Sequence, residues 1–510
     1  MTISNVFVFG DSLSDTGNLF TLTGGLVPPA PFYFNGRFSN GPLAVEYLTA
    51  KLGTNVKLNS FAVAGATTGT ENTLGKDLGA TLPGLQTQLA TFSALATLGG
   101  VDKDGLYIVW AGPNDFLDFL NGKNISDPAI LLQNGSLNLA NSATTLHSLG
   151  AVNIVLPNMT NLGRIPFSKN FQAEGAAITK AFNARVALDL DNLNFPVTEV
   201  DLFATGEAIA KDPASFGFSN ITDPLQPLQF SLNPPPNPQE FLFWDSLHPT
   251  TQGHAVFADT IYQTVTGTIP QPSFVNFYGT DDKDRLFGTS GNDNIRGLLG
   301  DDILDGRKGD DRIQGGLGND KLFGNQGDDI LSGDDGHDSI WGGQGDDIGF
   351  GGDSNDVLFG QMGDDIMVGD GGNDLIFGGM GNDYLLGGED KDILWGNEGK
   401  DILNGGLGQD WLYGFTGDDL LDGGADNDYL TGGQGQDQFV YRSGSGRDMI
   451  TDFRPGQDQL NLTSFGFSGF SSFIASVGLN NNTIDFGNGN ALLFANIDVF
   501  SLSGSDFIFA

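Results

Sequence analysis

The stretch NVFVFGDSLSDTGN, residues 5–18, carries the main clue to the fold of the first half of the chain. Its apolar run, residues 6–9, leads straight into Gly-Asp-Ser, so a serine follows a buried strand almost at once. In a parallel α/β sheet, functional groups gather beyond the carboxyl ends of the strands. We therefore expect Ser12 at such an edge, with its N–H pointing into a site and a helix N-terminus behind it.

Residues 1–267 alternate apolar strands with helix-like runs. Continuously apolar strands in this alternation predict a parallel α/β sandwich, and 510 residues are too many for one ordinary core. We expect a multidomain chain. The strand candidates are residues 5–10, 106–112, 151–157 and 195–202, and the clearest helix-like runs are 83–98 and 175–193.

Histidine is scarce, which shortens the search for a base that could activate Ser12. Asp245 precedes His248 by three residues, so a loop would let it hold one ring nitrogen while the other faces the serine. His254, in the helix-like run that follows, is interpreted as structural. The remaining histidines, His147 and His337, are interpreted as ordinary surface or packed residues.

Four stretches resemble the ordered sequence blocks of the GDSL, or SGNH, hydrolase family. They occur in family order and span most of residues 1–267, and residues 35–48 are similar to the branch with plant GDSL lipases and bacterial esterases. The stretches are FGDSLSDTGN (9–18), NSFAVAGATTG (59–69), AGPNDF (111–116) and WDSLHP (244–249).

The resemblance implies a flavodoxin-like α/β/α sandwich and a role for each matching residue. It implies Ser12 as nucleophile, His248 as general base and then acid, and Asp245 as the group that orients the histidine. The oxyanion donors would be the backbone N–H groups of Ser12 and Gly65 and the amide of Asn114. The implied activity is cleavage of a carboxylic ester, of a lipid or a small acyl ester, through an acyl-enzyme.

Two other functions stay open at this point. The same site serves a carbohydrate deacetylase or a phospholipase. A calcium-dependent surface or adhesion protein with an inactive esterase platform is a further alternative. For the acyl pocket, Phe32, Tyr33 and Phe34 are candidates, although aromatic residues in a loop are as often simple packing.

From Tyr278 to Phe439 the chain consists of eighteen consecutive nonapeptides of the form x-G-G-x-G-x-D-x-L. Position two is always Gly, position seven is always Asp, and position nine is apolar except at Gly349. Two nonapeptides make a coil, so each Asp stacks on the Asp eighteen residues later, in an oxygen-rich cage suited to Ca²⁺. The pattern resembles the RTX parallel β-roll, whereas a disordered tract would need no register. The predicted ligands are Asp284, Asp293, Asp302, Asp311, Asp320, Asp329, Asp338, Asp347, Asp356, Asp365, Asp374, Asp383, Asp392, Asp401, Asp410, Asp419, Asp428 and Asp437.

The charge of the chain supports the same interpretation. The net charge is −40, and residues 278–439 alone contribute 36 acidic and 9 basic side chains. Such a surface excludes nucleic acid as a partner and favours multivalent cations. We expect several Ca²⁺ ions with a structural, not catalytic, role, and a roll that is disordered at cytosolic calcium and folded outside the cell. The catalytic half should fold and act without calcium.

Outward strand positions of the repeats carry a row of aromatic residues on one face. A row of aromatics is unfavourable in water, so we expect another module or a partner chain to cover it, the alternative being ordinary β-propensity on a solvated sheet. The row includes Phe323, Trp341, Phe359, Phe377, Trp395 and Tyr413.

The last segment, residues 440–510, resembles the cap and C-terminal export signal behind RTX repeats. Asp506 followed by apolar residues fits a type I signal, which predicts a secreted bacterial protein that uses a type I secretion machinery; a simple edge-capping segment is the alternative. The stretch MTISNVFVFG lacks a basic region and its apolar run is short, so we expect no secretory signal there. We also expect no membrane helix, because no apolar run is long enough, and no disulfide, because no cysteine is present. The predicted domains are 1–267 (hydrolase), 268–277 (linker), 278–439 (β-roll) and 440–510 (cap and signal).

Overall fold

The computed structural model describes residues 3–121, 127–231 and 235–509. The chain divides into two compact units. Unit 1 comprises residues 1–120 and 132–272, and unit 2 comprises residues 121–131 and 273–510. The two are described separately below.

Unit 1 is built on one five-stranded sheet in which every neighbouring pair of strands is parallel. The strand order β2-β1-β3-β4-β5 is the flavodoxin-like order. The central strand β3 is buried along its whole length, as expected for a sheet covered on both faces. The predicted α/β/α sandwich is confirmed. The strands are β1 (Asn5–Gly10), β2 (Lys57–Ser60), β3 (Leu106–Trp110), β4 (Asn153–Pro157) and β5 (Thr198–Val200).

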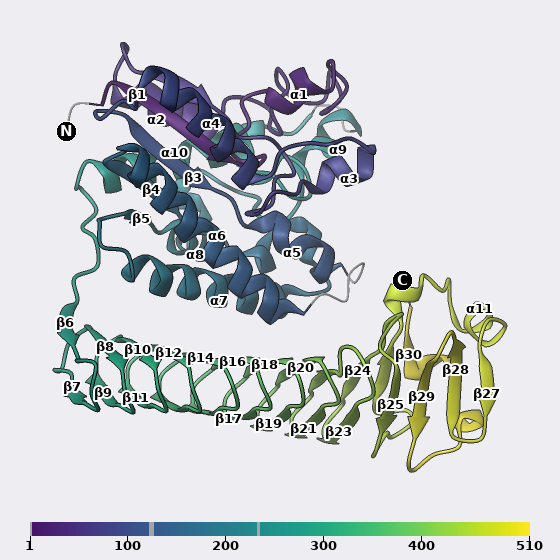
Figure 1. Cartoon of the computed structure of the whole chain (residues 1–510). Helices are drawn as coiled ribbons and strands as arrows, with labels where there is room; N and C mark the ends of the chain where they lie inside the picture. Colours follow the sequence, from purple (N-terminus) through teal and green to yellow (C-terminus); the bar gives the residue numbers. More distant parts are fainter. Residues whose placement is uncertain (1–2, 122–126, 232–234, 510) are drawn as a thin grey trace. The chain divides into compact units, whose positions relative to one another are not determined.

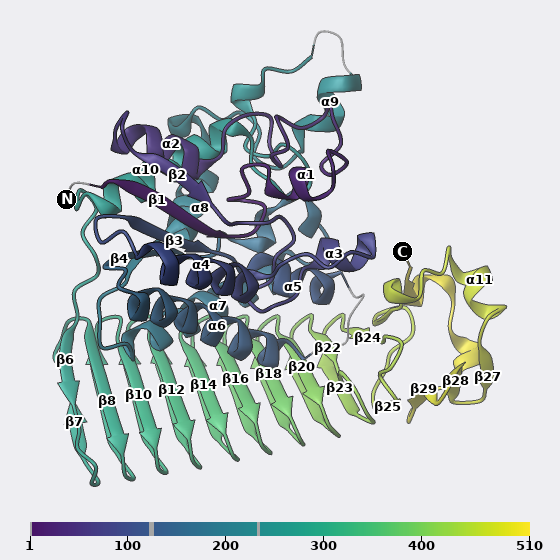
Figure 2. The same ribbon diagram turned by 45° about the horizontal axis from the view of Figure 1, so that its top comes forward.

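Helices cover both faces of this sheet (Figure 2). Helices α2 and α10 pack against each other on one face, and α4 and α6 lie on the other. The helices are α1 (Asn18–Leu22), α2 (Ala44–Leu52), α3 (Thr73–Leu78), α4 (Leu85–Gly99), α5 (Pro113–Leu120), α6 (Pro128–Leu149), α7 (Gln172–Asp191), α8 (Leu202–Lys211), α9 (Leu225–Ser231) and α10 (Thr251–Val265), with 3-10 turns η1 (Leu162–Arg164), η2 (Pro166–Ser168), η3 (Pro213–Phe216) and η4 (Pro238–Glu240).

Unit 2 is a parallel β-roll in which even-numbered strands form one sheet and odd-numbered strands the other (Figure 1). The register pairs Ile313 with Leu331 and Leu322 with Ile340, an offset of eighteen residues, so two nonapeptides form each coil as predicted. The roll strands are β6 (Val275–Tyr278), β7 (Arg285–Phe287), β8 (Asp293–Leu299), β9 (Ile303–Lys308), β10 (Arg312–Leu317), β11 (Lys321–Gln326), β12 (Ile330–Asp335), β13 (Ser339–Gln344), β14 (Ile348–Asp353), β15 (Val357–Met362), β16 (Ile366–Gly371), β17 (Leu375–Met380), β18 (Tyr384–Glu389), β19 (Ile393–Glu398), β20 (Ile402–Leu407), β21 (Trp411–Thr416), β22 (Leu420–Asp422), β23 (Tyr429–Gln434), β24 (Gln438–Val440), β25 (Arg447–Ile450) and β26 (Gln459–Asn461).

The ninth position of each repeat points into the roll and forms its core. Leu322, Ile340 and Leu358 are fully buried there, each stacked on the equivalent residue of the next coil. The exception, Gly349, has a local explanation: a Cβ at that position would lie 2.7 Å from the sulfur of Met367. The long side chain of Met367 therefore fills the space that Gly349 leaves.

The glycine at position two is required by the carboxylate of the same repeat. A Cβ on Gly306 would lie 2.3 Å from Oδ2 of Asp311, and a Cβ on Gly324 would lie 2.3 Å from Oδ2 of Asp329. No side chain fits at that distance. The invariant Gly and the invariant Asp thus form one steric unit.

The predicted C-terminal β cap is present beyond the last repeat. Three strands, β27 to β29, pair antiparallel and join the roll through β25. Phe473 is buried among other phenylalanine rings, including Phe507, and closes the end of the roll core. The cap comprises β27 (Gly478–Asn480), β28 (Thr483–Gly487), β29 (Asn490–Phe494), β30 (Phe507–Ile508), α11 (Phe470–Ile474), η5 (Thr463–Phe465), η6 (Val499–Ser501) and η7 (Gly504–Asp506).

The predicted aromatic row forms a continuous stack along the odd-numbered strands. Successive ring centroids are 4.3–6.1 Å apart and the ring planes differ by only 4–13°, so the rings cover each other's faces. Each ring is half-buried. Mutual stacking accounts for this burial, and the covering of the face by a module or partner stays a prediction. Within the described ranges, no helix has the length and apolarity needed to cross a membrane.

Candidate active site

Ser12 lies where the sequence places it, just beyond the carboxyl end of β1. The neighbouring strands β2 and β3 end at the same edge of the sheet, and Gly65 and Asn114 follow them. Asp11 shapes the turn, because its Oδ1 accepts the N–H of Leu13 at 3.0 Å. Parallel strand order thus brings three segments of the first 120 residues to one place.

His248 and Asp245 complete a continuous hydrogen-bonded chain with Ser12. Nε2 of His248 lies 2.9 Å from Oγ of Ser12, and Nδ1 lies 2.8 Å from Oδ2 of Asp245. With a proton on Nδ1, the histidine donates to the carboxylate, and Nε2 is free to accept the serine proton.

The Asp-x-x-His spacing lets Asp245 reach the ring of His248 because the segment folds into a tight loop. Oδ1 of Asp245 accepts the backbone N–H groups of Leu247 and His248, both at 2.8 Å. The N–H of Trp244 donates to the carbonyl of His248 at 2.8 Å and closes the loop. Burial favours the neutral form of Asp245, but the His248 charge and these donors outweigh it and hold the pKa of Asp245 below its usual value.

Tyr33 extends the hydrogen-bonded chain of Ser12, His248 and Asp245. Its hydroxyl donates to Oδ2 of Asp245 at 2.9 Å, and its ring packs on Phe38, which lies 5.0 Å from the ring of His248. Phe32 and Phe34 are 41% and 40% exposed, and neither of them nor Tyr33 lines the pocket beside Ser12. Tyr33 therefore packs beside the histidine, and a role of Phe32 and Phe34 in binding an acyl group stays a prediction.

We expect Tyr33→Phe to lower kcat for p-nitrophenyl butyrate about 10-fold, since it removes one hydrogen bond to a charged carboxylate. Loss of that donor also leaves the charge of Asp245 less compensated, which stabilises the protonated form of the neighbouring imidazole, so the acid limb of the pH–rate profile should move to higher pH. Phe34→Leu, at the exposed neighbour, is the matched control. A pH profile unchanged in Tyr33→Phe would contradict this role of the tyrosine.

Gly65 and Asn114, the predicted oxyanion donors, follow β2 and β3 at the edge of the sheet that carries Ser12, and Asn114 lines the same pocket as Ser12. Gly65 has φ +80°, and an added Cβ would lie 2.8 Å from Oδ1 of Asn72, so only glycine fits there. The Asn114 amide donates one hydrogen to the carbonyl of Ala66 at 3.1 Å. A side-chain amide has two donor hydrogens, so the second can serve a bound oxygen.

In unit 2, the repeat aspartates form two ladders along the turns. The N–H of Asp311 donates to Oδ1 of Asp329 at 2.8 Å, and the same bond recurs coil after coil. The second oxygen, Oδ2, is buried and has no protein donor within the described residues. This holds for Asp302, Asp311, Asp320, Asp329, Asp338, Asp347, Asp356, Asp365, Asp374, Asp383, Asp392, Asp401, Asp410, Asp419, Asp428 and Asp437.

Rows of buried carboxylate oxygens need a compensating cation or proton. Burial, reinforced by the charges of Asp329 and Asp365, raises the pKa of Asp347 to about 9. Burial likewise raises the pKa of Asp356 to about 9, with Asp374 and Asp338 adding to it. Ca²⁺ prefers carboxylate and carbonyl oxygens, so this donor set fits calcium.

The first two repeats differ from the others. Oδ2 of Asp284 accepts the N–H and the hydroxyl of Thr280 at 2.6 and 2.8 Å, and Thr289 donates to Asp293 in the same way. Their carboxylates therefore have protein donors in place of a cation. The difference comes from position three, where these two repeats carry Thr280 and Thr289.

Two further aspartates, which the nonapeptide pattern does not include, continue the ladders: Asp448 and Asp458, whose Oδ1 accepts the N–H of Asp437 at 3.2 Å. Oδ1 of Asp448 accepts the N–H of Asp428 at 3.1 Å, and its Oδ2 is buried with no protein donor in the described part of the chain. Asp448 lies after the last complete nonapeptide, twenty residues from Asp428 instead of eighteen. The signal was available in residues 446–450, GRDMI, which keep the G-x-D-x-apolar core of the repeat.

A flavodoxin-like sheet that carries serine, histidine and aspartate in one hydrogen-bonded chain is an arrangement that serine hydrolases use. Residues 6–261, half of the chain, match the model of the GDSL-like Lipase/Acylhydrolase family. The chain belongs to this family. RTX calcium-binding nonapeptide repeats match at residues 278–313, 306–340, 341–376, 377–412 and 413–450.

The chain is also similar to several individual proteins. It is 26% identical over 304 residues to a phosphatidylcholine-sterol acyltransferase of Aeromonas hydrophila, covering 50% of this chain and 88% of the relative. It is 26% identical over 284 residues to the thermolabile hemolysin of Vibrio parahaemolyticus, covering 51% of this chain and 64% of the relative. Among solved structures, the acetylxylan esterase of Geobacillus stearothermophilus is 17% identical with a TM-score of 0.31, covering 52% of this chain and 96% of that one.

Proposed function

We propose that the chain hydrolyses carboxylic esters through an acyl-enzyme formed on Ser12. The observation that carries this proposal is the chain of hydrogen bonds from Oγ of Ser12 through His248 to Asp245, with distances of 2.9 and 2.8 Å. Membership of the GDSL-like family supports it. The test is turnover of chromogenic esters by the whole chain and by its Ser12 variant.

Each residue has a defined task in this reaction. His248 takes the proton of Ser12 as Oγ attacks the ester carbonyl, and Asp245 stays ionised and stabilises the resulting imidazolium. The N–H groups of Ser12 and Gly65 and the amide of Asn114 bind the oxyanion. His248 then protonates the leaving alcohol, activates a water molecule and releases the acid.

Two of the alternatives are enzymes that differ from an esterase in substrate and not in catalytic residues; the third is an inactive surface protein. A deacetylase or a phospholipase would use the same residues, and a phospholipid ester gains support from the name of the Aeromonas relative, a phosphatidylcholine-sterol acyltransferase. A surface protein with an inactive platform would not require the Ser12–His248 contact of 2.9 Å. We therefore place ester hydrolysis first.

We expect Asn114→Ala to lower kcat by about 10²–10³-fold with a small change in KM, because an oxyanion donor acts mainly in the transition state. Steady-state hydrolysis of p-nitrophenyl butyrate measures both constants. Asn194→Ala, at an exposed position away from the site, is the matched control. An equal loss in both variants, or a change confined to KM, would remove Asn114 from the oxyanion site.

For unit 2 we propose that several Ca²⁺ ions bind along the ladders from Asp302 to Asp437 and at Asp448. When bound, calcium supplies positive charge among carboxylates that lack protein donors. We also propose export through a type I secretion machinery with the signal in residues 440–510, since RTX repeats are typical of secreted bacterial proteins. Export of a reporter fused to that segment, only in cells with the machinery, would test this.

A further inference from the structure

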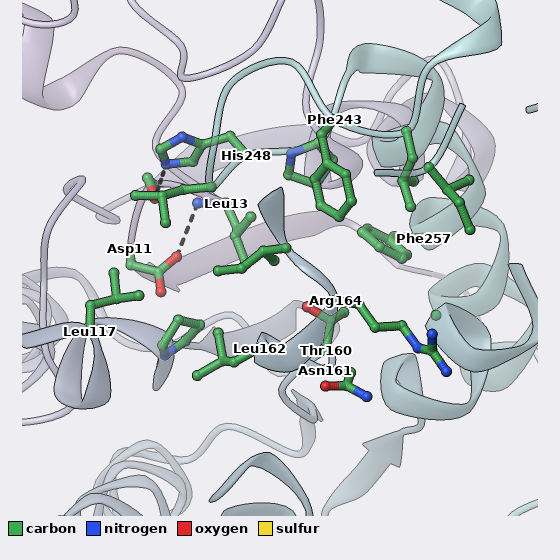
Figure 3. Close-up of a pocket in the computed structure, with 18 of the residues that line it drawn as sticks. Asp11, Leu13, Leu117, Thr160, Asn161, Leu162, Arg164, Phe243, His248 and Phe257 are labelled. Carbon is green, nitrogen blue, oxygen red and sulfur yellow. Dashed lines mark hydrogen bonds between the residues drawn. The ribbon is translucent and has the colours of Figure 1, made fainter. Parts of the chain in front are cut away.

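A narrow apolar cavity opens beside Ser12 and His248 and extends away from them within unit 1. Its volume is about 90 Å³, and most of its lining is apolar. Figure 3 shows Leu162 and Phe243 on opposite sides of this space, with Phe257 and Arg164 at the end away from His248. The small volume and the mostly apolar lining suit an unbranched acyl chain.

On one side of the cavity, helix α8 contributes small residues, which leave extra space. Gly206 and Ala210 are one helical turn apart, so they share a face, and both line the cavity. Glycine is unfavourable inside a helix. No close neighbour explains it here, because a Cβ added to Gly206 would meet nothing within 4 Å. The missing side chain leaves space that belongs to the cavity.

A network in which charges are paired borders the distal end of the cavity. Nε and Nη2 of Arg164 donate to the two carboxylate oxygens of Glu207 at 2.6 and 2.5 Å, and Asn161 donates to Glu207 at 2.8 Å. This network fastens η1 to α8. Because Glu207 neutralises the guanidinium, the end of the cavity offers no free charge to a ligand, which favours a chain that ends in a methyl group.

We propose that this cavity binds the acyl chain of the ester, that it selects an unbranched chain of limited length, and that Gly206 determines how deeply the chain enters. The inference rests on the proposed esterase function and names its substrate class. Each methylene that leaves water should raise kcat/KM about fourfold until the chain reaches Arg164. Beyond that length the gain should stop.

The test is the chain-length profile of the full protein on p-nitrophenyl acetate, butyrate, octanoate, dodecanoate and palmitate, each below its aggregation limit. In Gly206→Leu, the ratio of kcat/KM for octanoate to that for acetate should fall about 10- to 100-fold. Ala208→Leu adds the same side chain to an exposed position of the same helix and should keep the wild-type profile.

A Gly206→Leu profile parallel to the wild type at every chain length would overturn the inference. If that variant fails to fold, Ala210→Leu places a side chain on the same face one turn later and must show the same shift. Calorimetric binding of decanoate separates this inference from the esterase proposal. If the wild type cleaves no ester but binds decanoate more tightly than Gly206→Leu does, only the esterase proposal is rejected. If the two proteins bind decanoate equally, the acyl-binding role of the cavity is rejected.

Discussion

Replacement of Ser12 by alanine should lower kcat for ester hydrolysis about 10⁴- to 10⁶-fold, the loss expected when the nucleophile of a coupled serine–histidine–aspartate site is removed. The physical reason is the loss of Oγ, which lies 2.9 Å from Nε2 of His248. Without it no acyl-enzyme forms, and only the oxyanion donors and substrate binding remain. The measurement is hydrolysis of a chromogenic ester series from acetyl to long acyl.

The control for this experiment is Ser148→Ala, an exposed serine at the end of α6 whose hydroxyl bonds only its own helix. Its kcat should equal that of the wild type. If wild type and Ser12→Ala behaved alike on every ester, catalysis at Ser12 would be rejected. The calcium-dependent surface protein would then be the better account of the chain.

Removal of calcium should unfold the roll of the full chain and leave ester hydrolysis in place. Residues 278–439 carry 36 acidic and 9 basic side chains, and the buried Oδ2 atoms of the ladders lack protein donors. Without cations these charges repel one another, so the free energy of calcium binding becomes free energy of folding. Circular dichroism in chelator should lack the strand signal of unit 2 and regain it cooperatively as Ca²⁺ is added.

Two variants sharpen this test. Asp356 and Asp374 lie in adjacent coils of one ladder, and the double change Asp356→Asn, Asp374→Asn should raise the calcium midpoint several-fold. Asp284→Asn should leave it near the wild-type value, because Thr280 already donates to that carboxylate. A strand signal that is complete in chelator would contradict calcium-driven folding. Ester hydrolysis that disappears in chelator would contradict the independence of unit 1.

Much of the fold was accessible from the sequence because it depends on local periodicity. The nine-residue register predicts the eighteen-residue coil, since neighbours in the roll are always one fixed interval apart. The same register gives no information about the contacts made by the variable positions of each repeat. It did not separate Asp284 and Asp293 from the later repeats, where the difference comes from Thr280 and Thr289.

The candidate site was partly accessible for a similar reason. Ser12 and the Asp245–His248 loop are recognisable because each depends on a short segment: a strand end, and a tight loop three residues long. The contact of Tyr33 with Asp245 was not accessible, because the two residues are 212 positions apart. The loop that carries Tyr33 has no pattern that indicates what its hydroxyl meets.

The sequence by itself therefore determined the two kinds of architecture, the position of Ser12 beyond the first strand and the spacing of the carboxylates. These features follow from repeats and motifs whose parts interact at short or fixed separations along the chain. Only the tertiary structure decided the donor to Asp245, the filling of the space at Gly349 by Met367, and the cavity between η1 and α8. Those contacts join segments whose separation follows no period, so their geometry is set by how the helices and loops pack on the sheet.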